Sequence, residues 1–175
     1  MQPFELVKYC PRCGHPGGAP AIPFKCTSCQ LTLFFNPTVS ASAFVVLADG
    51  HLLLIRRAKN PGKGLLGTIG GFVDRGETAE EALRREIREE VHLEVDTIEY
   101  LTSSTNNYVY GGITYPVLDL FFICRAAPAS QPQVGDGVDS LVSRKITDIQ
   151  EDEMAFDSIK TALRALNKHP EKLRD

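Results

Sequence analysis

The sequence predicts an α/β fold in which helices cover both sides of a mixed sheet, preceded by a short cysteine-bearing segment. Three features lead to this class: two stretches with the pattern of β-hairpins, a charged helical stretch between them, and an amphipathic helical stretch near the C-terminus. Strands interrupted by helices along the chain are typical of layered α/β proteins. With 175 residues, the chain is long enough to bury a core of this kind.

The overall composition argues against several functional classes. The formal net charge is -3, which is not the basic excess expected of a protein that binds nucleic acid along its phosphate backbone. No segment approaches the roughly 18 apolar residues of a membrane span, and the start, MQPFELVKYC, lacks the apolar run of a secretory signal. We therefore expect a cytoplasmic protein with neither a membrane nor a nucleic acid as its main partner.

Four of the five cysteines have the spacing of a metal site. Cys10 and Cys13 form one CxxC pair, Cys26 and Cys29 form another, and twelve residues separate the pairs. Two such turns complete a tetrahedral set of thiolates, the arrangement of a structural Zn²⁺ ribbon. A disulfide framework is the alternative, but the absence of a secretion signal argues against it. Cys124 lies in an apolar stretch and is expected to be an inert buried thiol.

These cysteines define a predicted first domain, residues 1–35, followed by a main domain over residues 36–175. The first segment contains several prolines and glycines and too little apolar material for a core of its own. Bound metal must therefore stabilise it. Its modest positive charge favours a structural or docking role over the reading of nucleic acid.

The main domain opens with a hairpin pattern. The apolar stretches 41–47 and 51–57 are joined through Asp49-Gly50, a strong turn signal. A second hairpin is expected where 107–110 and 113–124 flank a Gly-Gly pair.

The last part of the chain predicts a loop and a terminal helix. The loop covers residues 126–137, which are rich in Pro, Ala, Ser, Gln and Gly. The helix covers 156–168, where Ile159, Leu163 and Leu166 form one apolar stripe.

The charged helix between the hairpins begins at a capping box. In Thr78-Ala-Glu-Glu81 the threonine side chain is expected to accept the backbone N–H of Glu81, whose carboxylate reaches back to Thr78. The helix therefore starts at Thr78 or at the next residue.

Winding this helix at about 100° per residue changes the interpretation of its glutamates. Such a charged run is usually a solvated face. With Glu86 set at zero, however, Glu90 falls at about 40° and Glu89 at about -60°, while Arg84 and Arg88 lie on the far side. Glu86 and Glu90 thus lie within the apolar arc, which consists of Ala79, Ala82, Leu83, Ile87 and Val91.

Three carboxylates so close together need a counter-charge, because desolvating them costs several kcal/mol each. An oxygen-only ligand set suits a hard cation, Mg²⁺ or Mn²⁺, better than zinc. Such an ion would bridge the carboxylates to the phosphates of a substrate and acidify a water for attack on phosphorus. A nearby glutamate could accept the water's proton.

The same residues resemble a known family motif. Gly71, Glu77, Arg85-Glu86-Ile87, Glu89-Glu90 and Leu93 follow the spacing of the Nudix box, Gx5Ex7REUxEExGU, in which U is bulky and aliphatic. All fixed positions match except the last glycine. The preceding ribbon resembles that of NADH pyrophosphatase-like members.

The resemblance implies a Nudix αβα sandwich and an enzyme, a hydrolase of phosphorus-containing anhydrides. Its substrate would be a nucleoside diphosphate linked to another moiety, such as NADH, ADP-ribose, a dinucleoside polyphosphate or a nucleotide sugar. It also implies that Glu86, Glu89 and Glu90 bind the divalent ions, with Glu89 as the expected general base. Many members are dimers, so a homodimer is one expected assembly.

The resemblance assigns supporting roles to further residues. The matching Glu77 and Arg85 brace the loop and the helix, and Gly70 and Gly71 match a glycine pair whose backbone admits metal or phosphate. A further acidic ligand often comes from a later strand or loop. Asp139 or the run 151–153 is a candidate, although a plain surface position is the stronger expectation for each.

Two positions depart from the family pattern. Thr68-Ile69 replaces the usual Leu-Pro before the glycine pair, which removes no catalytic atom. His92 replaces the glycine that would end the helix in a left-handed conformation. We expect His92 to be a tolerated structural variant.

The substrate is not fixed by these motifs. NADH pyrophosphatases carry a Ser-Gln-Pro-Trp-type motif after the box, but here the region is TSSTNNYVY and the chain has no tryptophan. Tyr108 and Tyr110 are candidates for stacking on a base and Asn107 for a polar contact, with cross-strand packing as the alternative. A different functional class also stays open, a non-catalytic nucleotide sensor or a ribbon-mediated nucleic-acid adaptor.

Overall fold

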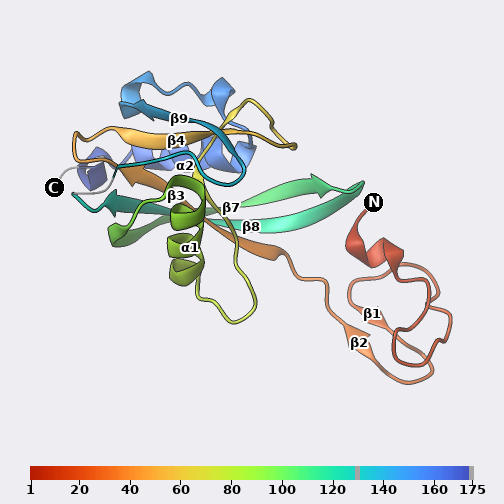
Figure 1. Ribbon diagram of the computed structural model, residues 1–175. Coiled ribbons are helices and arrows are strands. Elements are labelled where there is room, and N and C mark those ends of the chain that lie inside the picture. The colour runs from red at the N-terminus through yellow and green to blue at the C-terminus, as the bar shows by residue number, and fades with distance from the viewer. Residues whose placement is uncertain (129–130, 174–175) are drawn as a thin grey trace. The chain divides into compact units, whose positions relative to one another are not determined.

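The computed structural model describes residues 1–128 and 131–173, and the chain divides into two compact units (Figure 1). The N-terminal unit comprises Met1–Thr38 together with Asn107–Val117, and the second unit comprises Val39–Asn106 and the chain from Leu118 onward. The predicted domain boundary between residues 35 and 36 stays a prediction, because a compact unit is not by itself a domain that folds alone.

The N-terminal unit is small and contains little regular structure. A 3₁₀ turn, η1 (Pro3–Leu6), precedes two short antiparallel strands, β1 (Phe24–Lys25) and β2 (Thr32–Leu33). Its core gathers Cys10, Phe24 and Cys26. The segment Asn107–Val117 joins this unit through the backbone of Thr114, whose N–H donates to the carbonyl of Met1 at 2.7 Å.

The main sheet has seven strands in the order β5-β4-β3-β8-β7, with β6 paired to β3 and β9 paired to β4. The arrows of β3 and β8 point the same way in Figure 1, whereas β3 pairs with β4 and β6 in antiparallel fashion, so the sheet is mixed. The strands are β3 (Thr38–Val46), β4 (Leu52–Arg57), β5 (Leu66–Gly67), β6 (Ile69–Phe72), β7 (Val95–Tyr110), β8 (Ile113–Ala126) and β9 (Val138–Arg144).

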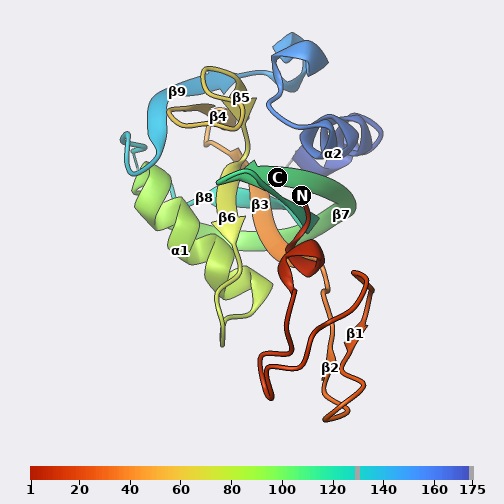
Figure 2. The same ribbon diagram turned by 90° about the vertical axis from the view of Figure 1, so that its right-hand side faces the viewer.

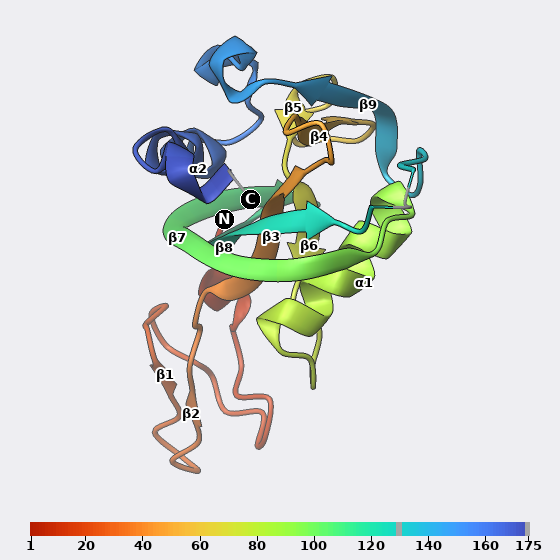
Figure 3. The same ribbon diagram turned by 90° about the vertical axis from the view of Figure 1, so that its left-hand side faces the viewer.

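One helix covers each face of this sheet, α1 (Ala79–Val91) on one side and α2 (Asp157–Asn167) on the other (Figures 2 and 3). Alternation along β3 separates the two cores. Ala43 and Val45 pack in the core that contains the apolar side of α1, and Phe44 and Val46 pack in the core that contains α2. The predicted αβα sandwich is therefore confirmed.

Most predicted elements are confirmed with small shifts in their bounds. The two hairpins, the charged helix and the terminal helix are all present, and Cys124 is fully buried. Burial raises the pKa of the Cys124 thiol to about 12, as expected of an inert core thiol. Strand β7 begins earlier than predicted, and β5, β6 and β9 were not predicted at all.

The C-terminal half adds three 3₁₀ turns, η2 (Ile146–Asp148), η3 (Glu151–Glu153) and η4 (Pro170–Leu173). Within the described residues of 126–137, the predicted loop is confirmed except that Ala126 ends β8. None of the helices in the described part of the chain has both the length and the apolar character needed to cross a membrane.

Candidate functional site

The candidate site is built on α1, which starts at the predicted capping box. The backbone N–H of Glu81 donates to the hydroxyl of Thr78 at 3.2 Å, and the N–H of Thr78 donates to the Glu81 carboxylate at 2.8 Å. This reciprocal pair satisfies two of the N–H groups left open at a helix start. The helix therefore begins at Ala79, as predicted.

The rotation of α1 about its axis also agrees with the winding from sequence. Leu83, Ile87 and Val91 are fully buried against the sheet. Glu86 and Glu90 are half-buried beside this face, whereas Glu89 is exposed. Two carboxylates thus lie at the border between the protein interior and solvent, with a third next to them.

Arg85 links these carboxylates to the loop before the helix. Its guanidinium donates to both oxygens of Glu77 at 2.8 and 3.0 Å, to Glu86 at 2.7 Å and to Glu89 at 3.3 Å. A further bond reaches the carbonyl of Phe72 at 3.1 Å. The hydrogen bonds from Arg85 lower the pKa of Glu77 and keep it ionised. Arg85 therefore holds the loop, the end of β6 and the helix together.

Glu90 makes its contact with the glycine pair on β6. Its carboxylate accepts the backbone N–H of Gly70 at 3.0 Å. Burial raises the pKa of Glu90 to about 8, and the Gly70 N–H offsets only part of this rise. Burial also raises the pKa of Glu86, despite the opposing effect of Arg85. Both groups would gain from a further positive charge nearby.

The two glycines lie very close to their neighbours. A side-chain Cβ on Gly71 would lie 2.4 Å from a carboxylate oxygen of Glu86. At Gly70, where φ is +145°, a Cβ would lie 2.2 Å from the carbonyl oxygen of Ala41. Gly70 is therefore required by the backbone of β3, whereas a side chain at Gly71 would displace the Glu86 carboxylate.

His92 ends the helix in the left-handed conformation predicted from the sequence. Its φ is 54° and its ψ is 34°, and its N–H donates to the carbonyl of Arg88 at 3.1 Å. The side chain is exposed, so the cap depends on the backbone.

We expect His92→Gly to stabilise the protein by about 1 kcal/mol, because glycine adopts this conformation without the penalty of a Cβ. Turnover of any substrate should be nearly unchanged, since the carboxylates stay in place. Urea unfolding and steady-state kinetics of both proteins would measure these effects. A large change in activity would instead assign the imidazole a direct role.

A loop after β8 completes the C-terminal end of α1. Three of its backbone N–H groups donate to the last open carbonyls of the helix: Gln133 to Val91 at 3.0 Å, Gly135 to Glu90 at 2.8 Å, and Asp136 to Glu89 at 3.1 Å. A Cβ on Gly135 would lie 2.1 Å from the Glu89 carbonyl oxygen. The sequence predicted a loop over residues 126–137 but not its contact with α1, for which the Gly-Asp-Gly run at 135–137 was the one available signal.

We expect Gly135→Ala to destabilise the protein by about 2 kcal/mol, because the added Cβ forces the loop away from α1 and removes backbone hydrogen bonds. The amides of Gln133 and Asp136 should then exchange faster with solvent. Hydrogen exchange and urea unfolding would measure both effects. Gly67→Ala is the matched control, because a Cβ there meets its nearest neighbours at 3.5 Å. Equal behaviour of the two variants would contradict this role of the loop.

The oxygen ligands of Glu86, Glu89 and Glu90 fit a hard divalent ion by chemistry. They are spread apart, however, by their bonds to Arg85 and Gly70. In the described part of the chain, the four cysteines form the one group of three or more His, Cys, Asp or Glu residues whose ligand atoms all lie within 4.8 Å of one another. The glutamate set is therefore an open, oxygen-lined site.

Two of the predicted further acidic ligands are already ion-paired. Glu151 contacts Arg164 with oxygens 2.8 and 3.0 Å from its Nε, and Glu153 contacts Arg144 at 2.7 Å. Asp139 is exposed on β9. The structure favours surface roles for all three residues.

The proposed substrate contacts belong to the other unit of the chain. Asn107, Tyr108 and Tyr110 lie in the segment that joins the N-terminal unit, whereas the glutamates lie in the second unit. Tyr110 is 68% exposed. The structure therefore does not bring these residues into the compact unit that contains α1.

The four ribbon cysteines converge on one point. The Sγ atoms of Cys10 and Cys29 are 3.6 Å apart, and those of Cys13 and Cys26 are 3.7 Å apart. Zn–S bonds of about 2.3 Å would place the sulfurs of a tetrahedral site roughly 3.8 Å apart. All four cysteines are free thiols, so the cluster fits a structural zinc ion better than the disulfide alternative.

The thiol chemistry of the cluster supports the same conclusion. The backbone N–H of Cys29, 3.5 Å from the sulfur of Cys26, lowers the pKa of Cys26 to about 6. Although the Leu31 N–H acts in the opposite direction, burial and the neighbouring thiols raise the pKa of Cys29 to about 11. One thiolate thus forms readily, and a full set of thiolates needs a bound cation.

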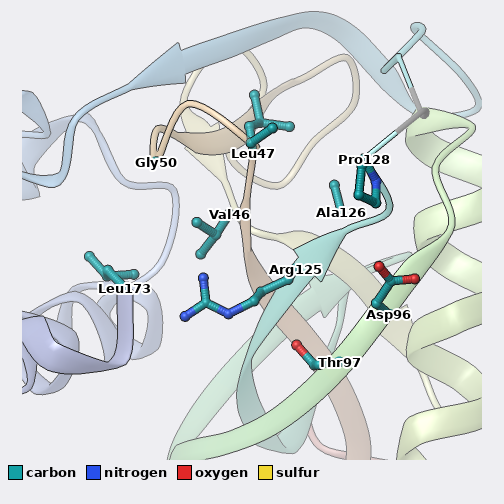
Figure 4. Close-up of a pocket in the computed structure, with 10 residues that line it drawn as sticks. Val46, Leu47, Gly50, Asp96, Thr97, Arg125, Ala126, Pro128 and Leu173 are labelled. Carbon is teal, nitrogen blue, oxygen red and sulfur yellow. The ribbon is translucent and has the colours of Figure 1, made fainter. Parts of the chain in front are cut away.

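A separate pocket lies in the second unit, between the β3–β4 turn, the start of β7, the end of β8 and η4 (Figure 4). Its lining includes Leu47, Asp96, Arg125 and Leu173. The guanidinium of Arg125 extends toward Leu173 and donates to the carbonyl of Lys172 at 3.1 Å. None of the site residues predicted from the sequence lines this pocket.

Comparison with known proteins agrees with the motif. The family model of the NUDIX domain matches residues 36–165. The NAD-capped RNA hydrolase NudC of Pseudomonas fluorescens is 36% identical over 100 residues, which are 55% of this chain and 35% of that protein. The mitochondrial NAD(P)H pyrophosphatase NUDT13 of Homo sapiens is 32% identical over 99 residues, which are 57% of this chain and 28% of that protein.

The chain therefore spans about a third of the length of the curated relatives it matches. A crystal structure of a NUDIX hydrolase from Nitrosomonas europaea has the same fold, with a TM-score of 0.73 and 21% sequence identity over 95% of this chain and 93% of that chain. With the motif, the fold and the family model in agreement, this chain belongs to the Nudix family.

Proposed function

We propose that the protein is a divalent-metal-dependent pyrophosphohydrolase that cleaves a phosphoanhydride bond in a nucleoside diphosphate linked to another moiety. The pair of half-buried carboxylates, Glu86 and Glu90, carries this proposal. Burial raises the pKa of both, and both border the glycine pair at β6. A site that holds carboxylates at such a cost in solvation is suited to cations.

Glu86, Glu89 and Glu90 would hold the ions, which we expect to be Mg²⁺ or Mn²⁺ because all the ligands are oxygens. When bound, such an ion supplies charge neutralisation for the diphosphate. Arg85 positions Glu86 and Glu89, and through Glu77 it also fixes the loop. Arg85 thus acts through the carboxylates.

The three glutamates differ in how their carboxylates are engaged. Glu86 is bound at 2.7 Å by Arg85, and Glu90 is bound by the Gly70 N–H. Glu89 has the longest contact with Arg85, at 3.3 Å, and its side chain is 52% exposed. Its carboxylate is therefore the best placed to accept a proton from the attacking water, and we assign the general base to Glu89.

Gly70 and Gly71 bring the backbone of β6 against β3 and against the Glu86 carboxylate, so this backbone would border the bound ions and, through them, the phosphates. Two relatives support this substrate class, one named for NAD-capped RNA and one for NAD(P)H. The chain has no Trp and no Ser-Gln-Pro-Trp-type motif, which argues against a strict NADH preference. ADP-ribose, dinucleoside polyphosphates and nucleotide sugars therefore stay in the proposed class.

A substrate panel tests the proposal. NADH, ADP-ribose, diadenosine polyphosphates and nucleotide sugars would be incubated with the zinc-loaded protein, with and without Mg²⁺ or Mn²⁺, and the products identified. We expect hydrolysis of at least one substrate only when metal is added. Glu89→Gln should lower the rate about 10²- to 10⁴-fold, since it removes the general base.

Glu80→Gln, an exposed position on the same helix, is the matched control and should keep the activity of the unchanged protein. Unchanged turnover in Glu89→Gln would remove the assignment of that residue. Binding of nucleotides without hydrolysis of any panel member would contradict the enzymatic proposal and favour a sensor.

A further inference from the structure

The face of the sheet that packs on α2 changes from apolar to polar partway along its central strands. On β3, Phe44 belongs to the core with α2, but Ser42 and Ser40, the next residues on this face, are polar. On the neighbouring strand β8, Phe121 belongs to the same core, and Asp119 is the next residue on this face. On this face of the sheet, the apolar core under α2 is therefore followed by a row of polar side chains, Ser42, Ser40 and Asp119.

Asp119 is a buried carboxylate with one described hydrogen-bond partner. It is 7% exposed, and the hydroxyl of Ser40, also 7% exposed, donates to its Oδ1 at 2.5 Å. Among the described residues, no lysine, arginine or histidine forms an ion pair with Asp119. A carboxylate offers about four acceptor sites, so most of its hydrogen-bonding capacity is unused.

The second oxygen of Asp119 is not sealed inside the protein. In the described part of the chain, every fully enclosed side-chain N or O atom has a hydrogen-bond partner except the hydroxyl of Ser158. Oδ2 of Asp119 has no hydrogen-bond partner and is not in that set. It is therefore not fully enclosed and reaches the protein surface. A nearly buried carboxylate with one accessible oxygen is costly unless something donates to it.

The register of the sheet relates Asp119 to the glutamates of α1. Strand β3 lies between β6 and β8, and Ser42 is paired with Gly70, whose N–H is held by Glu90. Ser40, the partner of Asp119, is paired with Phe72 at the end of β6. Neighbouring strands are about 4.8 Å apart, so Asp119 lies two strand spacings, roughly 10 Å, from this end of β6. This separation suits a nucleoside whose phosphates lie at β6.

We propose that Asp119, oriented by Ser40, accepts a hydrogen bond from the nucleoside part of the substrate. The donor is either a ribose hydroxyl or an amino group of the base, since both offer the hydrogen that a carboxylate lacks. The proposal rests on the proposed function for the identity of the ligand. It makes Asp119 a specificity-determining residue, because an analogue without the donor leaves a buried charge unpaired.

Asp119→Asn tests the proposal, because it keeps the size of the side chain and the bond from Ser40 but removes the charge. For ADP-ribose we expect KM to rise about tenfold or more with a smaller change in kcat. The unchanged protein should favour ADP-ribose over its 2′-deoxy analogue or over hypoxanthine diphosphate ribose, which lacks the amino group. One of the two analogues should lose less of its kcat/KM relative to ADP-ribose in Asp119→Asn than in the unchanged protein. The group that this analogue lacks is the donor to Asp119.

Binding of ADP-ribose by calorimetry without added Mg²⁺ or Mn²⁺ gives a readout independent of turnover. We expect Asp119→Asn to weaken this binding about tenfold, and Ser40→Ala to weaken it in the same direction by less. The exposed Asp148→Asn is the matched control and should bind as the unchanged protein does.

Failure of the enzymatic proposal would appear as absence of hydrolysis in every variant, while the metal-free binding comparison still tests Asp119. Equal affinity and equal discrimination in the unchanged protein, Asp119→Asn and Ser40→Ala would overturn the proposal. Should Asp119→Asn fail to fold, the result with Ser40→Ala decides it.

Discussion

Glu90→Gln is expected to abolish hydrolysis and at the same time to stabilise the protein at neutral and alkaline pH. The raised pKa of Glu90, about 8 against a usual 4.5, means that the folded protein holds a proton that the unfolded chain has already released. Stability therefore falls as the pH rises from about 4.5 to 8, by an amount on the order of 5 kcal/mol. Glutamine stays neutral, avoids this loss, and still accepts the Gly70 N–H.

Urea unfolding between pH 5 and pH 9, without added Mg²⁺ or Mn²⁺, measures the effect. We expect the two proteins to be similar near pH 5 and the variant to be more stable by a few kcal/mol near pH 9. Added Mn²⁺ should stabilise the unchanged protein at high pH and leave the variant largely unaffected. Glu80→Gln keeps Glu90, so its stability should fall with pH as that of the unchanged protein does. Parallel curves for Glu90→Gln and the unchanged protein would contradict this account.

Loss of zinc is the second large effect that we expect. The core of the N-terminal unit consists of three buried residues, two of which are cluster cysteines, so little else holds this unit together. Binding free energies of structural zinc sites are roughly 10 kcal/mol or more. Cys26→Ser, which removes the thiol with the lowered pKa, should release zinc and remove hydrogen-exchange protection from residues 1–38, while β4 and α1 stay protected.

Metal analysis and peptide-resolved hydrogen exchange measure these outcomes, with one zinc per chain expected in the unchanged protein. Cys124→Ala is the control, because it removes a buried thiol in the second unit and should retain zinc. Full protection of the N-terminal residues in a zinc-free Cys26→Ser protein would show that the ribbon does not depend on metal.

The sequence predicted the elements whose side chains carry a strong period. The apolar stripe of α1 and the Asp-Gly and Gly-Gly turns located one helix and two hairpins, and the winding of α1 placed Glu86 and Glu90 beside the core before any contact was known. The short strands β5 and β6 could not be found in this way. Each has between two and four residues and contains glycine, so neither shows a strand period.

Two features of the second unit were not predicted from the sequence, for different physical reasons. The loop at Gln133–Asp136 caps α1 with backbone N–H groups. Every non-proline residue has such a group, so the side chains of the loop do not indicate the contact. Asp119 did give a signal, a lone carboxylate inside the run VLDLFFIC. A charged residue at such a position is rarely fully buried unless it is paired, and that rule would have singled it out.

The N-terminal unit is assembled from two segments that are far apart in the sequence, Met1–Thr38 and Asn107–Val117. During synthesis, the cysteines leave the ribosome well before the segment that pairs with Met1 is made. At typical elongation rates the interval is on the order of ten seconds. The nascent ribbon can take up zinc in that time, but it gains its hydrogen bond from Thr114 only after most of the sheet of the second unit has been translated.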